Sequence, residues 1–193
     1  MRMRLGWLKH RVPRSIAALA ICSLAFGQPD AWAASKDSRG AGMHAGAFGR
    51  VTGLPLPRYV SIGGAPARMR VGPGTDYPIR WVYHHRGTPV EIIEEWGNWR
   101  RIRDADAATG WMYAPLLSGR RTAIVAPWDS DGIALHRRPA GAASTIATLG
   151  PRVLLDVADC SGSWCRVSLP PGELEGHVRQ SALWGVYPGE RVR

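Results

Sequence analysis

The sequence predicts an all-β fold in which two tandem small barrels follow a cleaved signal peptide and a flexible leader. Two observations carry this prediction. Short runs rich in β-branched and aromatic residues, such as "IRWVYHH" and "PVEIIEEW", alternate with Gly, Pro, Asp and Asn, and no window of 11 residues holds a helical stripe. That pattern is typical of short strands joined by tight turns. The second half of the chain then repeats the first at a nearly constant spacing, which indicates a duplicated unit.

The first 33 residues have the three parts of a secretory signal peptide. A basic "MRMRLGWLKHRVPR" precedes the apolar "SIAALAICSLAFG", and "AWA" at 31–33 supplies small residues for cleavage. The apolar run is too short for a retained membrane span. We therefore expect cleavage after Ala33, a periplasmic or secreted protein, and no transmembrane segment in the mature chain. Residues 34–53 are small and polar without periodicity, so a flexible leader is expected.

The repeat appears as an offset of 65 or 66 residues. "WGNWRRIR" and "TGWMYAPLL" correspond to "SGSWCRVS" and "EGHVRQSAL", which aligns Trp99 with Trp164 and Gly110 with Gly176. Upstream, "ARMRVGP" aligns with "IALHRRP". The same short strands and turns are therefore expected in both halves.

The repeat divides the mature chain into two units. We predict one barrel over 54–121, a second over 122–188, and a short tail at 189–193. A β domain of this size is marginal alone, because it buries only about 60% of the surface that its unfolded chain exposes. Close packing of the two copies is expected for that reason.

One hairpin register accounts for both copies. Gly97 and Asn98 form a two-residue turn of the type that takes Gly at its first position. This register predicts three facing pairs: Trp96–Trp99, Glu95–Arg100 and Ile93–Ile102. Val90 and Ile92 have the opposite parity to Ile93, so a β-bulge is expected to intervene.

The same register in the second copy places Cys160 opposite Cys165. In a non-hydrogen-bonded antiparallel pair the Cα atoms lie about 4.5 Å apart, which is within disulfide reach. A disulfide therefore stands where the first copy has the ion pair Glu95–Arg100. An even cysteine pair agrees with an exported protein. Two cysteines without a clustered His make a poor metal site, and no metal or cofactor is expected.

Several motifs of this chain resemble one known family. The first copy has "MRVGPGTDYPI", "GTPVEII", "NWRRI" and "GWMYAPLL", and the second has the more divergent "LHRRPAGAASTIATLG", "SWCRVS" and "GHVRQSALWGVYP". These motifs resemble the bacterial SH3 domain of exported envelope proteins, over about 57–188. The resemblance implies two SH3-like barrels of five or six strongly bent antiparallel strands. It also implies an envelope binding module, directed at peptidoglycan or cell-wall peptides.

The resemblance also suggests ligand-binding residues. Trp99 and Trp164 match the tryptophan that borders the binding groove of SH3-like barrels. Trp111 matches an aromatic beside that groove, although the second copy has His177 there, and Tyr77 could form a further wall. Aromatic faces suit sugar and proline rings alike. The alternative interpretation is that these tryptophans fill two small cores. Proline-motif binding is not implied, because the tyrosine-rich pattern of eukaryotic SH3 domains is absent.

Catalytic residue patterns are not found, and we expect no enzyme. A disulfide would remove the thiolate needed for a cysteine nucleophile. The neighbours Glu94 and Glu95 point to opposite faces of a strand, as do His84 and His85, so neither pair converges on one substrate or metal. "GPGTD" does not open a helix, so it is a turn and not a phosphate cradle.

Charge leaves three hypotheses for the partner. The mature chain has 20 basic and 14 acidic residues, a net charge of +6 that suits either solubility or an anionic surface. Nucleic acid is not expected for an exported protein. The leading hypothesis is a non-catalytic module that binds peptidoglycan or an envelope protein or peptide. The alternative is a structural or protein–protein adaptor without glycan binding. Anionic-polymer binding is the third, and it predicts steep weakening by salt.

Overall fold

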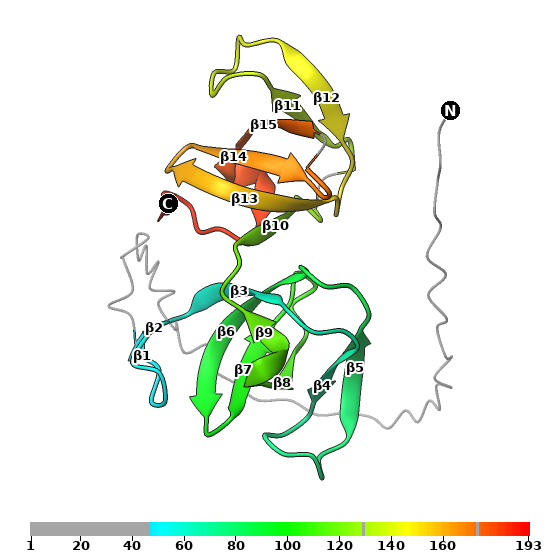
Figure 1. Cartoon of the computed structure of the whole chain (residues 1–193), viewed down its shortest axis with the longest axis vertical. Helices are drawn as coiled ribbons and strands as arrows, with labels where there is room; N and C mark the ends of the chain where they lie inside the picture. The colour runs from blue at the N-terminus through cyan, green and yellow to red at the C-terminus, as the bar shows by residue number, and fades with distance from the viewer. Residues whose placement is uncertain (1–46, 129, 173) are drawn as a thin grey trace, which may run out of the picture. The chain divides into compact units, whose positions relative to one another are not determined.

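The computed structural model describes residues 47–128, 130–172 and 174–193, whose regular structure consists almost entirely of short antiparallel strands (Figure 1). The all-β prediction is confirmed. The predicted signal peptide lies outside the described residues. Nowhere in the described part of the chain does a helix reach the length and hydropathy of a membrane span.

The first copy is one curled sheet with the strand order β5-β4-β8-β7-β6-β3-β9. Its elements are β3 (Arg58–Ile62), β4 (Ala67–Arg70), β5 (Ile79–Tyr83), β6 (Pro89–Trp96), β7 (Trp99–Arg103), β8 (Thr109–Tyr113), the 3-10 turn η1 (Ala114–Leu116) and β9 (Leu117–Ser118). A separate hairpin, β1 (Ala47–Phe48) with β2 (Pro55–Leu56), precedes this sheet.

The second copy repeats this order as β12-β11-β15-β14-β13-β10-β16, with β17 added beside β13. Its elements are β10 (Thr122–Val125), β11 (Ile133–His136), β12 (Thr145–Leu149), β13 (Leu154–Ser161), β14 (Trp164–Leu169), β15 (Leu174–Arg179), η2 (Gln180–Ala182), β16 (Leu183–Trp184) and β17 (Arg191–Val192).

Strand pairing confirms the internal repeat. Arg70 pairs with Trp111 in the first copy, and His136 pairs with His177 in the second, an offset of 66 on both strands. The sheet also bulges at the same two places in each copy: the extra residue lies on β5 and β12 opposite β4 and β11, and on β6 and β13 opposite β7 and β14. Equivalent positions of the two barrels can therefore be compared directly.

Each copy has its own apolar core, built from every second side chain along its strands, which points inward. Burying a large aliphatic side chain contributes about 1.5–3 kcal/mol, so these residues dominate the stability of each barrel. The first core contains Leu56, Ile62, Ala67, Met69, Tyr83, Val90, Ile92, Ile102 and Met112. The second contains Ala123, Val125, Leu135, Leu149, Leu155, Val157, Cys160, Cys165, Val167, Val178, Leu183, Val186 and Val192.

The predicted hairpin register is confirmed near the turn and wrong beyond it. Trp96 faces Trp99 and Glu95 faces Arg100, with Gly97 at a φ of +48°. Ile102, however, faces Ile92 and not Ile93, because the expected bulge lies between Ile92 and Glu94. The bulge leaves Ile93 as the extra residue, so every pair further from the turn shifts by one position.

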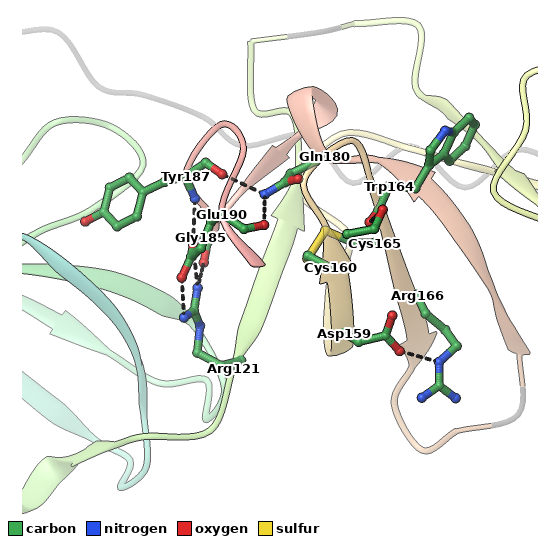
Figure 2. Close-up of a disulfide and its surroundings, with 11 residues drawn as sticks. Arg121, Asp159, Cys160, Trp164, Cys165, Arg166, Gln180, Gly185, Tyr187 and Glu190 are labelled. Carbon is green, nitrogen blue, oxygen red and sulfur yellow. Dashed lines mark hydrogen bonds and ion pairs between the residues drawn. A yellow bond between two sulfur atoms is a disulfide. The ribbon is translucent and has the colours of Figure 1, made fainter. Parts of the chain in front are cut away.

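The predicted disulfide is confirmed. Cys160 and Cys165 face each other across β13 and β14 with a Cα–Cα distance of 4.1 Å, and both are buried (Figure 2). The equivalent rung of the first barrel holds Glu95 and Arg100, whose Oε1 and Nε atoms are 3.6 Å apart. The same strand pair is therefore joined by an ion pair in the first copy and by a disulfide in the second.

Glu95 also holds the β1–β2 hairpin against the first barrel. Its carboxylate, which has no exposed surface, accepts hydrogen bonds from the backbone of Val51 (3.0 Å) and Thr52 (2.9 Å), and from the Thr52 hydroxyl (2.7 Å). Arg58 donates a further bond of 2.7 Å. Burial by itself would raise the pKa of Glu95, but the hydrogen bonds from Arg58, Thr52 and Val51 outweigh burial and lower that pKa to about 2. The end of the predicted leader thus has specific contacts.

The two copies belong to one compact unit and share side-chain contacts. The Tyr59 ring lies 4.6 Å from that of Tyr187 and 5.3 Å from that of Trp184, measured between centroids. The Tyr187 hydroxyl donates a hydrogen bond of 2.8 Å to Glu91, which is buried. Burial, followed by the hydrogen bond to Glu91, raises the pKa of Tyr187. The expected packing of the copies therefore includes a polar contact.

Candidate ligand groove

A cavity of about 560 Å³ lies in the first barrel, where the loop between β4 and β5 meets the ends of β7 and β8. It is lined by Pro66, Arg68, Arg70, Gly74, Thr75, Asp76, Asn98, Trp99, Tyr113 and Leu116. We refer to this cavity as the first groove.

Two aromatic rings form one wall of the first groove. Trp99 begins β7 and faces Tyr113 at the end of β8, with ring centroids 5.7 Å apart and planes inclined by 56°. Trp99 is half-buried, and 42% of Tyr113 is exposed. Strand alternation explains this placement, because Arg100 and Ile102 point inward and Trp99 points outward. Trp99 therefore lies outside the apolar core.

Charged side chains of both signs line the same groove. Arg68 and Asp76 are exposed, and neither side chain forms a hydrogen bond or ion pair with any residue that the structure describes. Arg70 is half-buried and donates a hydrogen bond of 2.7 Å from Nη1 to the carbonyl of Tyr77. This bond ties the loop that carries Asp76 to β4.

The other predicted aromatic residues of the first barrel lie beside the groove. The Tyr77 ring packs on the loop glycines, since a Cβ at Gly72 would lie 2.4 Å from it. Tyr77 is 47% exposed, but it does not line the cavity. Trp111 is half-buried between Arg70 and Arg101 in the sheet and does not line the cavity either. Of the predicted ligand-binding residues, Trp99 therefore belongs to the first groove.

The second barrel covers its equivalent tryptophan. Trp164 faces Arg179, as Trp99 faces Tyr113, and the Arg179 guanidinium lies 4.3 Å from the centre of the Trp164 ring. The His136 ring contacts Trp164 edge-on, with centroids 5.4 Å apart. Only 8% of Trp164 is exposed. Figure 2 shows this residue next to Cys165, with its ring directed away from the disulfide. The cation–π contact stabilises this closed arrangement.

The framework of the groove is common to both copies, although its lining is not. His136 Nδ1 lies 3.0 Å from the Ala143 carbonyl, which reproduces the contact between Arg70 and Tyr77. In contrast, the charged positions of Arg68 and Asp76 are occupied in the second copy by Ala134 and Ala142. The duplicated barrel therefore retains the loop closure but not the charges.

Sequence reasoning identified Trp99 alone among the lining residues, and it missed the charged Arg68, Arg70 and Asp76 as well as Tyr113. A signal for Tyr113 existed, because extending the hairpin register from β7 to β8 places it opposite Trp99. The contribution of the β4–β5 loop had no such local signal, since it depends on how the sheet curls.

The chain matches one protein family and has limited similarity to solved structures. The family model of the bacterial SH3 domain matches residues 63–119 and again 129–185. Among solved structures, the chain is similar to NlpC2 and NlpC1 from Trichomonas vaginalis, at 10% and 9% identity and a TM-score of 0.29 for each. The matches cover 66% and 70% of this chain and 48% of each of those chains, so this chain spans about half their length. No curated protein matches.

Proposed function

Because this chain belongs to the bacterial SH3 domain family, we propose that it is a non-catalytic envelope module that binds a ligand in the first groove. The proposed ligand is peptidoglycan or a cell-wall peptide, and the proposed location is the periplasm or the exterior. The signal-peptide pattern of residues 1–33 supports export. The disulfide supports a non-catalytic role, since it removes both thiolates.

The observation that carries this proposal is the difference between the two barrels. The first groove presents Trp99 and Tyr113 to solvent in a cavity of about 560 Å³, whereas Arg179 covers Trp164 in the second barrel. Exposed aromatic rings with one polar edge offer apolar contact area to sugar rings and peptide backbones at little cost in side-chain entropy. We therefore assign ligand binding to the first barrel.

Sedimentation of the mature protein with purified sacculi tests this proposal. Wild type is expected in the pellet, and Trp99→Ala in the supernatant. Trp96→Ala is the matched control, because Trp96 is 59% exposed and faces Trp99 across the hairpin but does not line the groove. Far-UV circular dichroism should show that all three proteins are folded. If wild type stays in the supernatant, or if Trp96→Ala and Trp99→Ala behave alike, the proposal is wrong.

A second candidate, the protein–protein adaptor, is favoured by a different surface. Strand β5 is the last strand of the first sheet, and its Ile79 and Trp81 are 46% and 55% exposed. Exposed apolar residues on an edge strand are a common feature of protein-binding surfaces. Crosslinking from position 81 in cells, followed by mass spectrometry, would support the adaptor if one envelope protein is recovered. Crosslinks to glycan peptides alone would count against it.

A further inference from the structure

Several arginines of the first barrel are held by carboxylates, whereas the groove arginines Arg68 and Arg70 are not. The arginines that form ion pairs within the first copy are Arg58, Arg100, Arg101 and Arg103. Arg68 projects from the same sheet but has no partner among the described residues. An unpaired guanidinium beside two aromatic rings retains all of its N–H donors for a ligand, and its planar fork matches a carboxylate.

Arg70 adds a second, oriented guanidinium to the groove. One of its terminal nitrogens is engaged by the Tyr77 carbonyl at 2.7 Å, which fixes the side chain while other N–H groups stay unbonded. A guanidinium that is already oriented loses less conformational entropy when it binds. Arg68 and Arg70 together therefore provide a prepared site for a carboxylate.

Asp76 places the opposite charge in the same cavity. It contributes to the lining together with Arg68 and Arg70 but pairs with neither of them. Charges of opposite sign that share a cavity without pairing can each contact a different charge of one ligand. A ligand that carries both an ammonium and a carboxylate satisfies both sets of groups.

From this arrangement we infer that the first groove recognises a peptide with a free ammonium and a free carboxylate. The two groove arginines bind the carboxylate, Asp76 binds the ammonium, and the Trp99–Tyr113 wall contacts the adjoining chain. The inference rests on the proposed function, and it names a ligand class: a cell-wall peptide whose diamino-dicarboxylic residue is not crosslinked or amidated. The second barrel, with Ala134 and Ala142 at the charged positions, is expected not to bind this ligand.

Calorimetric titration of the mature protein with three soluble peptides tests this inference. The first is L-alanyl-γ-D-glutamyl-meso-diaminopimelate with its alanine amine acetylated and its glutamate carboxylate amidated, so that diaminopimelate carries the ammonium and the carboxylates. The second also has its diaminopimelate carboxylates amidated, and the third also has its diaminopimelate amine acetylated. Each modification is expected to weaken binding to wild type about tenfold or more, which is the scale of losing a charge-assisted hydrogen bond.

Three variants assign the charges to individual residues. Arg68→Gln should bind the free and amidated peptides alike, and Asp76→Asn should bind the free and acetylated peptides alike. Arg138→Gln is the matched control, because Arg138 is an exposed arginine of the second barrel whose side chain has no partner among the described residues. It is expected to keep the wild-type preferences.

The outcomes separate this inference from the proposed function. If wild type sediments with sacculi but binds all three peptides equally, or binds none of them, the inference is overturned and the proposed function stands. The inference is also overturned if Arg68→Gln and Asp76→Asn, both folded, keep the wild-type preferences. If wild type neither sediments nor binds a peptide, both proposals fail.

Discussion

Replacing Glu95 with glutamine tests how much the buried Glu95 carboxylate stabilises the first barrel. The carboxylate has no exposed surface and accepts bonds from Arg58, Val51 and Thr52 while it faces Arg100. The glutamine side chain can accept part of these bonds through its oxygen, but its NH₂ group would face the N–H and O–H donors that the carboxylate now accepts from. Arg58 and Arg100 would also lose their counter-charge. One lost charge-assisted bond costs about 1.5–3 kcal/mol, and breaking a buried ion pair about 3–5 kcal/mol. We therefore expect Glu95→Gln to lower the free energy of unfolding by about 3 kcal/mol.

The matched control for this substitution is Glu94→Gln. Glu94 is the next residue and also pairs with an arginine, Arg101, but both side chains are about half exposed. An exposed ion pair contributes at most about 1 kcal/mol. Urea unfolding at pH 7, followed by tryptophan fluorescence, measures both variants. Equal midpoints for the two variants would refute the anchoring role of Glu95.

The same carboxylate predicts a specific pH dependence. Its pKa is about 2 in the folded protein and 4.5 ordinarily, so the unfolded chain binds its proton at higher pH. The stabilisation is therefore complete above pH 4.5 and is lost as the pH falls toward 2. Wild type should lose more stability than Glu95→Gln between pH 5 and pH 2.5, and parallel curves would contradict this account.

Three further predictions concern the disulfide, a close contact and salt. Replacing Cys160 and Cys165 together with alanine should cost about 2 kcal/mol, because the closed loop is short, and thermal unfolding measures it. Gly110→Ala should destabilise the first barrel by about 1–3 kcal/mol, since its Cβ would lie 2.6 Å from Met69 and 2.7 Å from the Arg70 carbonyl. Gly119→Ala, which has open space around it, should be neutral in the same denaturant titration. Raising salt from about 50 to 200 mM should weaken sacculus binding less than about tenfold, whereas a loss of about a thousandfold would indicate an anionic polymer.

Local chemistry made the hairpins predictable. A two-residue turn fixes which residues face each other in the first rungs, so the Glu95–Arg100 and Cys160–Cys165 pairs could be derived from the positions of Gly97 and Gly162. The constant spacing of the repeat then predicted the same register in the second copy. The all-β class followed for the same reason, because turn residues and strand patterns are short-range features.

The position of the bulge was decided by tertiary structure. Parity alone showed that β6 must contain an irregularity, but the place of the extra residue depends on where the strand bends around the core. The sheet puts it at Ile93, and Ile92 therefore joins the buried cluster opposite Ile102. The pattern of residues along the strand does not show where that bend lies.

The sequence by itself determined the class of fold, the duplication and the disulfide, and it proposed Trp99 as a ligand-binding residue. Only the tertiary structure decided that the first groove is open and carries Arg68, Asp76 and Tyr113, while Arg179 covers Trp164. The physical reason is the range of the interactions. Turns and strand pairs join residues a few positions apart, whereas the groove joins residues up to 50 positions apart, from Pro66 to Leu116, which meet only after the sheet has curled.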